Sequence, residues 1–571
     1  MNNKPFSWQH KAATLCCAVA CSLTIFSSCN QKSATTDQAA ADTGSAPHLE
    51  QRGPGKQLIV DGKPFLVLGG ELHNSSATNA AYMDPLLARL DSMHLNTVLA
   101  AITWELTEPQ EGKYDFSLVD SVLDGARKNH LKVCLLWFGT WKNSFSHYAP
   151  EWVKADYKRF PRMHIKGGFP VESITPLSAE AMNADAKAFA AMMKHVKEND
   201  AQHTVIMIQV ENEVGLLGDS RDRGPLAEKA YQGQVPAQLL SYLQKNKDHL
   251  LPETQKLWAA NGWRTQGTWG EVFGNSPQAE EAFMAWNYSR YINNVAAAGK
   301  AAYALPMFVN TWIVQPEDKG PGDYPSGGPQ AQSHDIWRAG GSAIDILSPD
   351  VYLDDFEDIA ALYSRNGNNL FIPESKADDF GAANAFLLIG KYNAIGYSPF
   401  GIENRVKDVN NDPIPLAYDV LQQLAPEILE AQSKGTITGV SLSKSKSEEV
   451  INMNGYKLDI KIKTNRNGTE THDVGYGIII SKGPNEFIVA GSNIQINFYP
   501  TTPGPAYVGY ASLDEGKYVD GKWVAGRRLN GDDIMLDYHI AKEAAAQRTG
   551  SVVRTLGSKP QIMKLKLYRF E

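Results

Sequence analysis

Two glutamates, Glu213 and Glu374, are the residues of this sequence best placed to do chemistry. Glu213 stands in the run I-Q-V-E-N-E-V-G and Glu374 in L-F-I-P-E-S, each just past a short apolar run typical of a buried parallel strand. A single glutamate in such a place is more often a solvated or ion-paired residue. Two carboxylates at the ends of different strands, however, can supply a proton donor and a second carboxylate, the pair that cleavage of a glycosidic bond requires.

Two neighbours of these glutamates strengthen this hypothesis. Asn212 precedes Glu213 and can donate a hydrogen bond to a sugar hydroxyl beside the scissile bond. Tyr352 follows another apolar run, I-L-S-P-D-V, and can donate its phenolic hydrogen to a carboxylate. Such a bond favours the ionised form, which a nucleophilic carboxylate needs.

The elements that must position these residues alternate between strands and helices. Eight strand-like runs lie at residues 65–69, 97–102, 133–137, 205–210, 307–310, 344–347, 370–372 and 395–399. Helical patterns occupy residues 84–93, with a proline in the first turn, 118–129 and 178–198. Alternating strands and helices favour a parallel sheet, and a count of eight favours closure into a (β/α)8 TIM barrel. Glu213 then follows the fourth strand and Glu374 the seventh, at the active face of the barrel.

The end of the barrel is predicted from its prolines. Ile414 lies between Pro413 and Pro415 and is expected in a loop. Residues 416–432 predict a closing helical segment that is interrupted at Pro426. The catalytic barrel is therefore expected over residues 49–432.

Two further regions differ from a plain barrel. Residues 216–305 form an insertion longer than a normal crossover, with Trp258, Trp263, Trp269 and Trp286. It can roof the cleft into a pocket, which favours an exo-acting enzyme, or it can serve as an oligomer contact. Residues 433–571 alternate apolar and polar residues between turn residues, which predicts a C-terminal β-sandwich. That domain either binds carbohydrate or caps the barrel.

Composition excludes some classes of partner. The 571 residues carry 55 Lys and Arg against 63 Asp and Glu, for a net charge of −8. Because no long basic run occurs, we expect no nucleic-acid partner. The sequence also shows no metal-ligand cluster and no nucleotide motif, so we expect neither a metal nor a cofactor. It says nothing of the oligomeric state.

The N-terminal residues predict export. Residues 12–26 are apolar and too short to span a bilayer permanently, and small residues then lead to Cys29 as in a bacterial lipobox. Residues 1–29 are thus interpreted as a lipoprotein signal peptide with lipidation at Cys29, and residues 30–48 as a flexible tether. We expect a protein anchored by lipid in the outer membrane, on its periplasmic or surface face. The alternative is an ordinary signal peptide and a freely periplasmic protein. Cys134 alone among the five cysteines lies after residue 29 and is expected as a small buried hydrophobe.

Four motifs in order resemble glycoside hydrolase family 35, the β-galactosidases, in the bacterial branch with a β-domain after the barrel. They are G-G-E-L-H, N-T-V-L-A-A-I-T-W-E-L-T-E-P, V-E-N-E-V-G and I-P-E-S. The resemblance implies that Glu213 is the acid/base, that Glu374 is the nucleophile and that the reaction retains anomeric configuration. It also implies that Asn212 holds the 2-hydroxyl and that Tyr352 bonds the nucleophile. The two carboxyl groups are then expected roughly 5–5.5 Å apart.

The chain departs from the family where galactose is usually contacted. Residues 136–144 read L-W-F-G-T-W-K-N-S in place of the usual Cys-Ala-Glu-Trp stretch, and two alanines, Ala100 and Ala101, replace a usual tyrosine. By position, Trp141 is expected to stack on the sugar ring and Lys142 and Asn143 to bond the 4- and 6-hydroxyls. The alternative is that Trp141 is a packing residue and Lys142 a surface charge.

The leading prediction is an exo-acting β-galactosidase that removes terminal β-galactosyl residues from oligo- or polysaccharides. His73, at the end of the first strand, is expected either on the pocket floor or as a structural histidine. Another retaining β-glycosidase of the same clan, a β-mannosidase or an endo-glycanase, would keep both glutamates. A non-catalytic glycan-binding lipoprotein is the third alternative.

Overall fold

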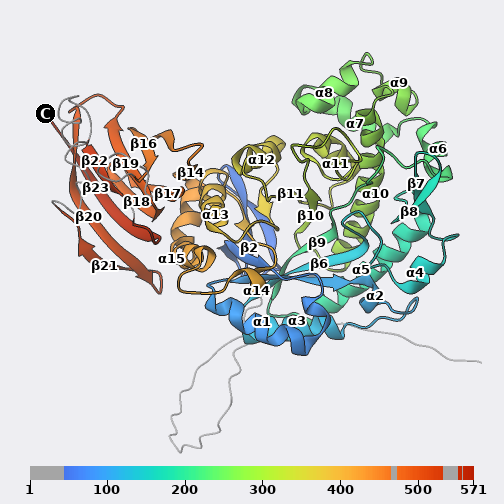
Figure 1. The fold of residues 1–571 in the computed structure, drawn as a ribbon, viewed down its shortest axis with the longest axis horizontal. Helices are drawn as coiled ribbons and strands as arrows, with labels where there is room; N and C mark the ends of the chain where they lie inside the picture. Colours follow the sequence, from blue (N-terminus) through green and yellow to red (C-terminus); the bar gives the residue numbers. More distant parts are fainter. Residues whose placement is uncertain (1–43, 464–471, 531–550, 556) are drawn as a thin grey trace, which may run out of the picture. The chain divides into compact units, whose positions relative to one another are not determined.

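The barrel strands form one parallel sheet that closes on itself (Figure 1). The structure is a computed structural model, and it describes residues 44–463, 472–530, 551–555 and 557–571. The neighbouring order of the strands is β11-β10-β9-β6-β5-β4-β13-β12. Their bounds are β4 Val67–Glu71, β5 Thr97–Thr103, β6 Lys132–Lys142, β9 Val205–Asn212, β10 Met307–Trp312, β11 Ile346–Asp350, β12 Phe371–Ile372 and β13 Gly396–Tyr397. The ends of this order meet just past β11 and β12, where the Val351 amide donates to the Glu374 carbonyl at 3.0 Å. The predicted TIM barrel is confirmed.

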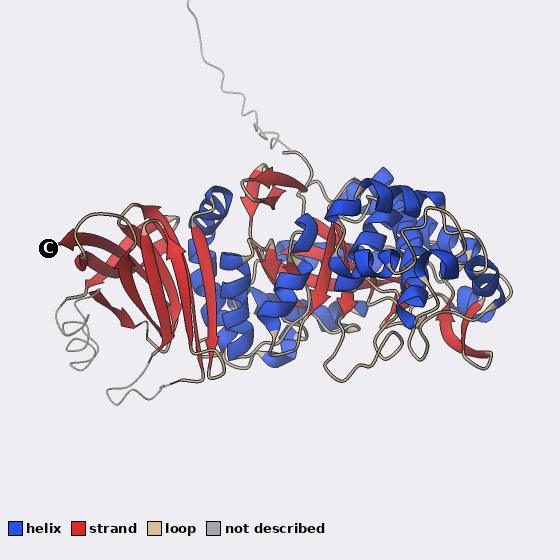
Figure 2. Ribbon diagram, turned by 90° about the horizontal axis from the view of Figure 1, so that it is seen from above, coloured by secondary structure: helices blue, strands red, loops and turns tan. Residues whose placement is uncertain are grey.

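Helices surround the barrel strands (Figure 2). They are α1 Ala80–Ser92, α2 Trp104–Thr107, α3 Ser117–Lys128, α4 Glu151–Ala155, α5 Ala179–Asn199, α10 Pro277–Ala302, α11 His334–Gly340, α12 Phe356–Tyr363, α13 Asp379–Lys391, α14 Ile402–Arg405 and α15 Pro413–Lys434. The predicted start of α5 is confirmed, because Ser178 accepts from the Ala181 amide as its N-cap. The predicted start of α1 is wrong. Asn79 caps this helix by accepting from the Tyr82 amide at 3.0 Å, so Pro85 lies one turn inside it.

Two expectations for the last barrel helix are also wrong. Ile414 lies in the first turn of α15 rather than in a loop, and the helix continues through Pro426. Pro413 stands at the first helical position, where the missing N–H has no helical partner to lose. Pro413 therefore starts the helix, although the prolines of this segment had predicted a loop around Ile414 and an interruption at Pro426.

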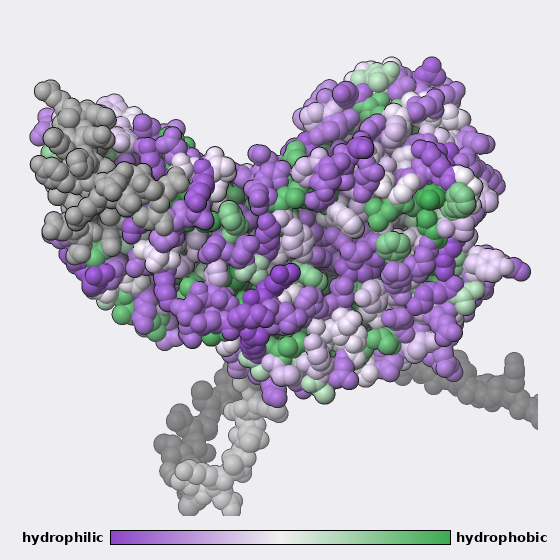
Figure 3. All heavy atoms as spheres, in the orientation of Figure 1, coloured by the Kyte–Doolittle hydropathy of each residue, from purple (hydrophilic) through white to green (hydrophobic). Residues whose placement is uncertain are grey.

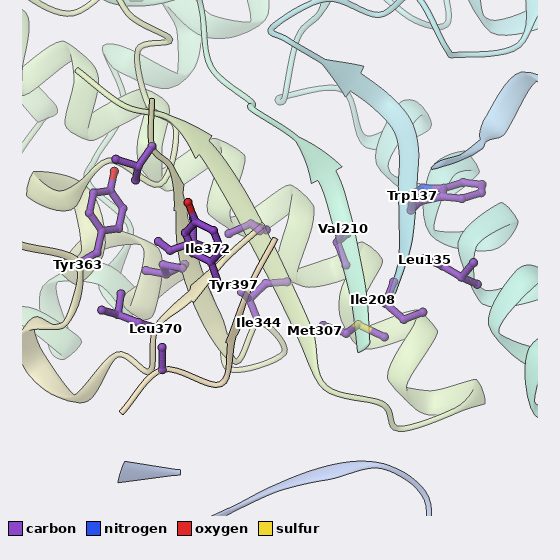
Figure 4. Packing of buried hydrophobic residues seen from close by; sticks show 14 of the residues in the cluster. Leu135, Trp137, Ile208, Val210, Met307, Ile344, Tyr363, Leu370, Ile372 and Tyr397 are labelled. Carbon is purple, nitrogen blue, oxygen red and sulfur yellow. The ribbon is translucent and has the colours of Figure 1, made fainter. Parts of the chain in front are cut away.

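Side chains of the barrel strands alternate between two apolar layers. On β6, Leu135 and Trp137 belong to the layer between strands and helices, which Figure 4 shows together with Ile208 and Val210 of β9. The residue between the first two, Leu136, faces the barrel interior. Cys134 also lies in that interior layer and is fully buried, as predicted.

A small antiparallel sheet precedes the barrel. It comprises β1 His48–Arg52, β2 Gly55–Val60 and β3 Lys63–Phe65, and it contributes Leu58 and Val60 to the interior layer of the barrel. His48, the last residue of the predicted tether, thus belongs to a strand, and Ala46 packs against the core. The predicted signal peptide, Cys29 and the tether up to residue 43 lie outside the described residues. Among the residues that are described, no helix has the length and apolar character to cross a bilayer.

The predicted insertion folds as short helices between β9 and α10. They are α6 Pro225–Tyr231, α7 Ala237–Lys245, α8 Pro252–Ala259 and α9 Trp269–Phe273. Trp258 and Trp269 are each 1% exposed, Trp286 of α10 is 6% exposed, and Trp263 meets the Trp258 ring edge-on at 5.1 Å. These tryptophans therefore form the core of the insertion itself. A β-hairpin of β7 Arg162–Ile165 and β8 Phe169–Ile174 lies between α4 and α5.

The C-terminal region is a β-sandwich, as predicted. One antiparallel sheet has the order β14-β17-β18-β23-β20-β21, and the other has the order β15-β16-β19-β22. The bounds are β14 Ile437–Ser443, β15 Glu448–Met453, β16 Tyr456–Ile462, β17 Val474–Gly483, β18 Glu486–Ser492, β19 Ile494–Pro500, β20 Tyr507–Val519, β21 Lys522–Arg528, β22 Ser551–Thr555 and β23 Gln561–Phe570. The sandwich has its own apolar core, and its first sheet packs on α13. Gly390 of α13 and Gly439 of β14 permit this approach, because a Cβ on Gly390 would lie 2.6 Å from the Gly439 Cα.

Candidate active site

The structure brings Glu213 and Glu374 together at the carboxyl ends of the barrel strands. Glu213 directly follows β9, and Glu374 lies two residues past β12. The two residues are 7% and 6% exposed. One carboxylate oxygen of Glu213, one of Glu374 and one of Asp350 all lie within 4.8 Å of one another. Three acids from three different strands therefore share one small volume.

Glu374 is surrounded by hydrogen-bond donors. The Tyr352 hydroxyl donates to Oε2 at 2.9 Å, and the side-chain amides of Asn310 and Asn212 donate to Oε1 at 3.3 and 3.4 Å. Burial of its hydroxyl and the negative charge of Glu374 raise the pKa of Tyr352, which therefore stays protonated as a donor. Donors from both sides stabilise a negative charge on Glu374.

Glu213 has the opposite environment. Burial raises its pKa to about 7, the charge of Glu374 adds to the rise, and Lys142 and a bond with Asp350 oppose it. Its Oε2 accepts a 2.5 Å hydrogen bond from the Asn143 side-chain amide. Near pH 7 a proton is therefore present on Glu213 in about half of the molecules, beside Glu374 and its hydrogen-bond donors. A proton donor and an anionic nucleophile need this difference between two adjacent carboxyl groups.

Asn310 connects the three acids and is a site residue that was not predicted from the sequence. It ends the predicted fifth strand and lies within β10. Its amide nitrogen donates to Asp350 Oδ2 at 2.8 Å as well as to Glu374, and its oxygen accepts from the Glu213 backbone amide at 3.1 Å. The available signal was a polar residue at the carboxyl end of a predicted barrel strand.

Two more acids at strand ends, Asp350 and Glu71, were also not predicted as site residues. Asp350 ends β11 and is 3% exposed, and burial with the charges of Glu374 and Glu213 raises its pKa well above the ordinary range. Glu71 ends β4 and is fully buried, and neither of its carboxylate oxygens has a hydrogen-bond partner within the described residues. Burial and the Glu374 charge raise the pKa of Glu71 well above the ordinary range as well. Both residues therefore favour the protonated, uncharged carboxyl form more than an exposed acid does.

The same acids are the ones able to ligate a cation. Oxygen atoms of Glu213, Asp350 and Glu374 lie close enough together for it. However, the raised pKa values of Glu213 and Asp350 favour their protonated forms, and amide or phenol groups already donate to both oxygens of Glu374. This environment favours proton sharing between carboxyl groups over binding of a hard cation.

The structure places the three residues predicted to clamp the sugar in different environments. The prediction for Trp141 is wrong: its ring is fully buried against Tyr288 and Tyr291, and its indole N–H donates to the Ile174 carbonyl at 3.0 Å. Core packing thus encloses the ring, and it has no free face for a sugar. Lys142 is 6% exposed, so it is not a surface charge, and its Nζ lies 5.1 Å from the centre of the Phe138 ring.

Asn143 and His73 also differ from the expectation in their contacts. The Asn143 side-chain amide donates its hydrogen bond to Glu213. His73 is half-buried with its ring edge-on to Phe400 at 5.0 Å, and its backbone amide donates to Glu403. Within the described part of the chain, His73 makes no hydrogen bond or ring contact with the three central acids. The structure therefore brings Asn143 into the site by way of Glu213 and leaves His73 at its edge.

A buried acid pair supports the backbone below Glu213. Glu211 accepts from the backbone amides of Thr140 and Trp141 at 3.1 and 2.7 Å. Asp185 accepts from the Trp137 indole and the Thr140 hydroxyl at 2.9 and 2.7 Å. Burial, the charge of the neighbouring Asp185 and a hydrogen bond with it raise the pKa of Glu211 well above the ordinary range. The pair holds the end of β6 against β9.

The backbone is strained beside this acid pair. Glu211 and Glu213 have φ angles of 61° and 44°, and Asn143 and Ser144 have φ angles of 50° and 67°. Residues other than glycine occupy this left-handed region only when surrounding contacts hold them there. Two of these residues, Asn143 and Glu213, are joined by the 2.5 Å side-chain hydrogen bond.

Comparisons with known proteins identify a similar family for part of the barrel. The glycoside hydrolase family 42 model, described as beta-galactosidase, matches residues 78–298, a range that includes Glu213 and ends before Glu374. A model described as a domain of unknown function (DUF5597) matches residues 415–541. The resemblance to β-galactosidases is thus supported, whereas the assignment to family 35 in particular is not.

Curated relatives point in the same direction over short stretches. A beta-galactosidase of Xanthomonas manihotis is 30% identical over 168 residues, which are 29% of this chain and 26% of that protein. Beta-galactosidase 17 of Arabidopsis thaliana is 26% identical over 164 residues, which are 28% of this chain and 22% of that protein. The chain thus matches about a quarter of the length of these relatives.

Solved structures with a similar fold include two glycosidases. One is a beta-galactosidase from the psychrophilic Marinomonas ef1, with a TM-score of 0.42 and 12% identity over 64% of this chain and 61% of the other. The other is a beta-1,4-D-mannanase from Cryptopygus antarcticus, with a TM-score of 0.39 and 13% identity over 66% of this chain and 95% of the other.

Proposed function

We propose that the protein is a retaining, exo-acting glycoside hydrolase that removes terminal β-galactosyl residues. The observation that carries the proposal is the contrast between Glu213, whose pKa is raised to about 7, and Glu374, which three donors surround. One oxygen of Glu213 lies within 4.8 Å of one oxygen of Glu374, and this close approach supports retention, because inverting enzymes keep their carboxyl groups roughly 6.5–9.5 Å apart to admit a water.

The proposed reaction has two displacements. In the first, a carboxylate oxygen of Glu374 attacks the anomeric carbon while Glu213 gives its proton to the departing oxygen, which leaves as an alcohol. An ester between the sugar and Glu374 results. In the second, Glu213 removes a proton from water, the water oxygen attacks the anomeric carbon, and the bond to Glu374 breaks. Two inversions give net retention, and both glutamates return to their starting states.

Galactose is the proposed terminal sugar because of the similarity to β-galactosidases, whether the chain is assigned to family 35 or to family 42. The Asn212 amide lies on Glu374 and is available to the 2-hydroxyl of the bound sugar, a contact that strengthens in the transition state. The burial of Trp141 removes one of the three residues expected to clamp galactose. For that reason a different retaining β-glycosidase, such as a β-mannosidase, is the second candidate.

A panel of aryl β-glycosides on wild type and two variants tests the proposal. Wild type should hydrolyse the β-galactoside with retention, and Glu374→Ala should be inactive on every substrate because no ester can form. Glu213→Ala should still release an activated leaving group such as dinitrophenol, which departs without a proton. Azide should then rescue turnover and give the β-galactosyl azide. Preference for a β-mannoside would select the second candidate, and an α-azide would show that the two roles are reversed.

We also propose that the protein is exported and attached to a membrane by lipid at Cys29. The support is the sequence alone, in which an apolar stretch and small residues precede that cysteine. The chemistry proposed for the barrel does not depend on this attachment.

A further inference from the structure

A groove of about 640 Å³ lies beside the candidate active site. It is formed by the loop after β11, the start of α13, helix α12 and the turn between β14 and β15. In the view of Figure 1, the surface between the C-terminal sheets and α12 is hollowed and mainly hydrophilic, as Figure 3 shows. A volume of this size is within the range of pockets that hold small organic ligands.

The groove is continuous in the chain with the reacting residues. Val351 and Leu353, the two neighbours of Tyr352, line it, and so does Lys376, two residues after Glu374. The Val351 amide bonds the Glu374 carbonyl at 3.0 Å, so the groove wall and the nucleophile are directly connected. The Tyr352 side chain is 41% exposed while its hydroxyl bonds Glu374. The groove and the site thus share the segments that follow β11 and β12, although Tyr352 and Glu374 do not themselves line the groove.

An unpaired amide points to a ligand that forms hydrogen bonds. Asn384 of α13 lines the groove and is only 9% exposed, and its side chain makes no hydrogen bond in the described part of the chain. The other buried residues of α13 are glycine or apolar. The amide atoms of Asn384 are open to solvent at the groove, so a bound hydroxyl group can replace water as their hydrogen-bond partner.

The other groups of the groove favour a neutral ligand with apolar faces. Its lysines are paired, because Lys376 bonds Asp354 at 3.0 Å, Lys446 bonds Glu357 at 2.6 Å and Lys444 bonds Asp473 at 2.6 Å. Cations that already have partners do not require a charged ligand. Phe380, at the start of α13, is 37% exposed and offers an aromatic face. A sugar ring presents hydroxyl groups at its edge and apolar C–H groups on its faces, which matches this lining.

We propose that this groove binds the sugar residues that carry the terminal galactosyl unit, so that the enzyme prefers an oligosaccharide to a simple β-galactoside. The inference rests on the proposed function. Asn384 supplies hydrogen bonds to a remote sugar residue and Phe380 supplies a stacking face, while Glu213 and Glu374 act on the terminal unit.

The test compares two substrates on variants of the full chain. Phe380→Ala and Asn384→Leu should lower kcat/KM for β-1,4-galactotetraose about tenfold more than for an aryl β-galactoside, mainly through KM, which corresponds to about 1.4 kcal/mol of binding. Asn384→Leu removes an unpaired amide and replaces it with an apolar residue of similar size, so the folded state should not be weakened. The matched control is Phe570→Ala, since Phe570 is a 44% exposed phenylalanine of the β-sandwich.

The outcomes separate this inference from the proposed function. An unchanged ratio between the two substrates in both groove variants would overturn the groove assignment and leave the chemistry standing. Absence of turnover on any aryl β-glycoside by wild type would instead overturn the proposed function. In that case calorimetry with galactotetraose on wild type and Asn384→Leu still decides the groove: binding that only wild type shows supports it, and equal binding or none refutes it.

Discussion

Replacing Glu374 with glutamine should lower the pKa of Glu213, because a neighbouring negative charge raises that pKa. With oxygens at most 4.8 Å apart, two unit charges at an effective dielectric constant of about 20 repel by about 3.5 kcal/mol, or about 2.5 pKa units. The carboxylate charge is shared by two oxygens, and burial is the larger cause of the shift. We therefore expect the pKa of Glu213 to fall from about 7 by roughly 1–2 units in Glu374→Gln.

Two measurements follow this change. In wild type, kcat/KM on an aryl β-galactoside should decline above about pH 7 as Glu213 loses its proton. In the inactive Glu374→Gln variant, carbon NMR of labelled glutamate side chains, assigned by comparison with Glu213→Gln, should give the lowered value directly. Lys142→Met is the opposite control, because Lys142 lowers the pKa of Glu213 and its removal should raise it. A Glu213 pKa that stays at about 7 in Glu374→Gln would refute the electrostatic reasoning.

Three further predictions concern stability, positioning and attachment. Glu213 has a folded-state pKa of about 7 against an ordinary value of 4.5. Its protonated form therefore contributes to the free energy of unfolding below pH 4.5, and this contribution, about 3 kcal/mol, is lost as the pH rises through 7. Glu213→Gln should thus raise the melting temperature over wild type at pH 8 and have little effect at pH 4.5; an equal effect at both would contradict the shift. Glu211→Ala leaves two buried backbone amides without their acceptor. It should lower kcat/KM at least tenfold and shift the pH at which kcat/KM declines on the alkaline side. Glu211→Gln should restore both the value of kcat/KM and this pH. A lower melting temperature in Glu211→Ala without a shift of the alkaline decline in kcat/KM would show that Glu211 is merely structural. Cys29→Ala should move the protein from the membrane to the soluble fraction, and fatty-acid labelling of that variant would disprove the attachment site.

The barrel was predictable because its strands are almost entirely apolar. All eight predicted strands are present, and the two glutamates lie where the strand count put them. A buried parallel strand needs an apolar run, and such a run is visible without knowledge of its neighbours. Helix boundaries near proline were less predictable, because a proline can stand at the start of a helix or inside it. Pro413 is the first residue of α15, whereas Pro85 lies inside α1.

The rest of the site depends on register and packing that a single sequence does not contain. Trp141 and Lys142 are adjacent on β6, so their side chains point to opposite faces of the strand. Tertiary contacts alone decide that Lys142 faces the acids and that Trp141 enters the helical core. Asn310 and Asp350 are single polar residues at strand ends, a pattern that also occurs in ordinary turns. Their importance follows from bonds between strands that are distant in the sequence.

The charge balance of the site explains why Lys142 is buried there. The raised pKa values of Glu71, Asp350 and Glu213 favour the uncharged forms of these acids, and Lys142 is the cation that opposes the rise at Glu71 and Glu213. In the proposed mechanism Glu374 then becomes a neutral ester, which removes a repulsion from Glu213 and leaves the cation in place. The loss of this repulsion, with the positive charge of Lys142 still present, favours ionisation of Glu213. Glu213 must be a base in the second displacement, so the buried lysine prepares its change of role at the moment that the ester forms.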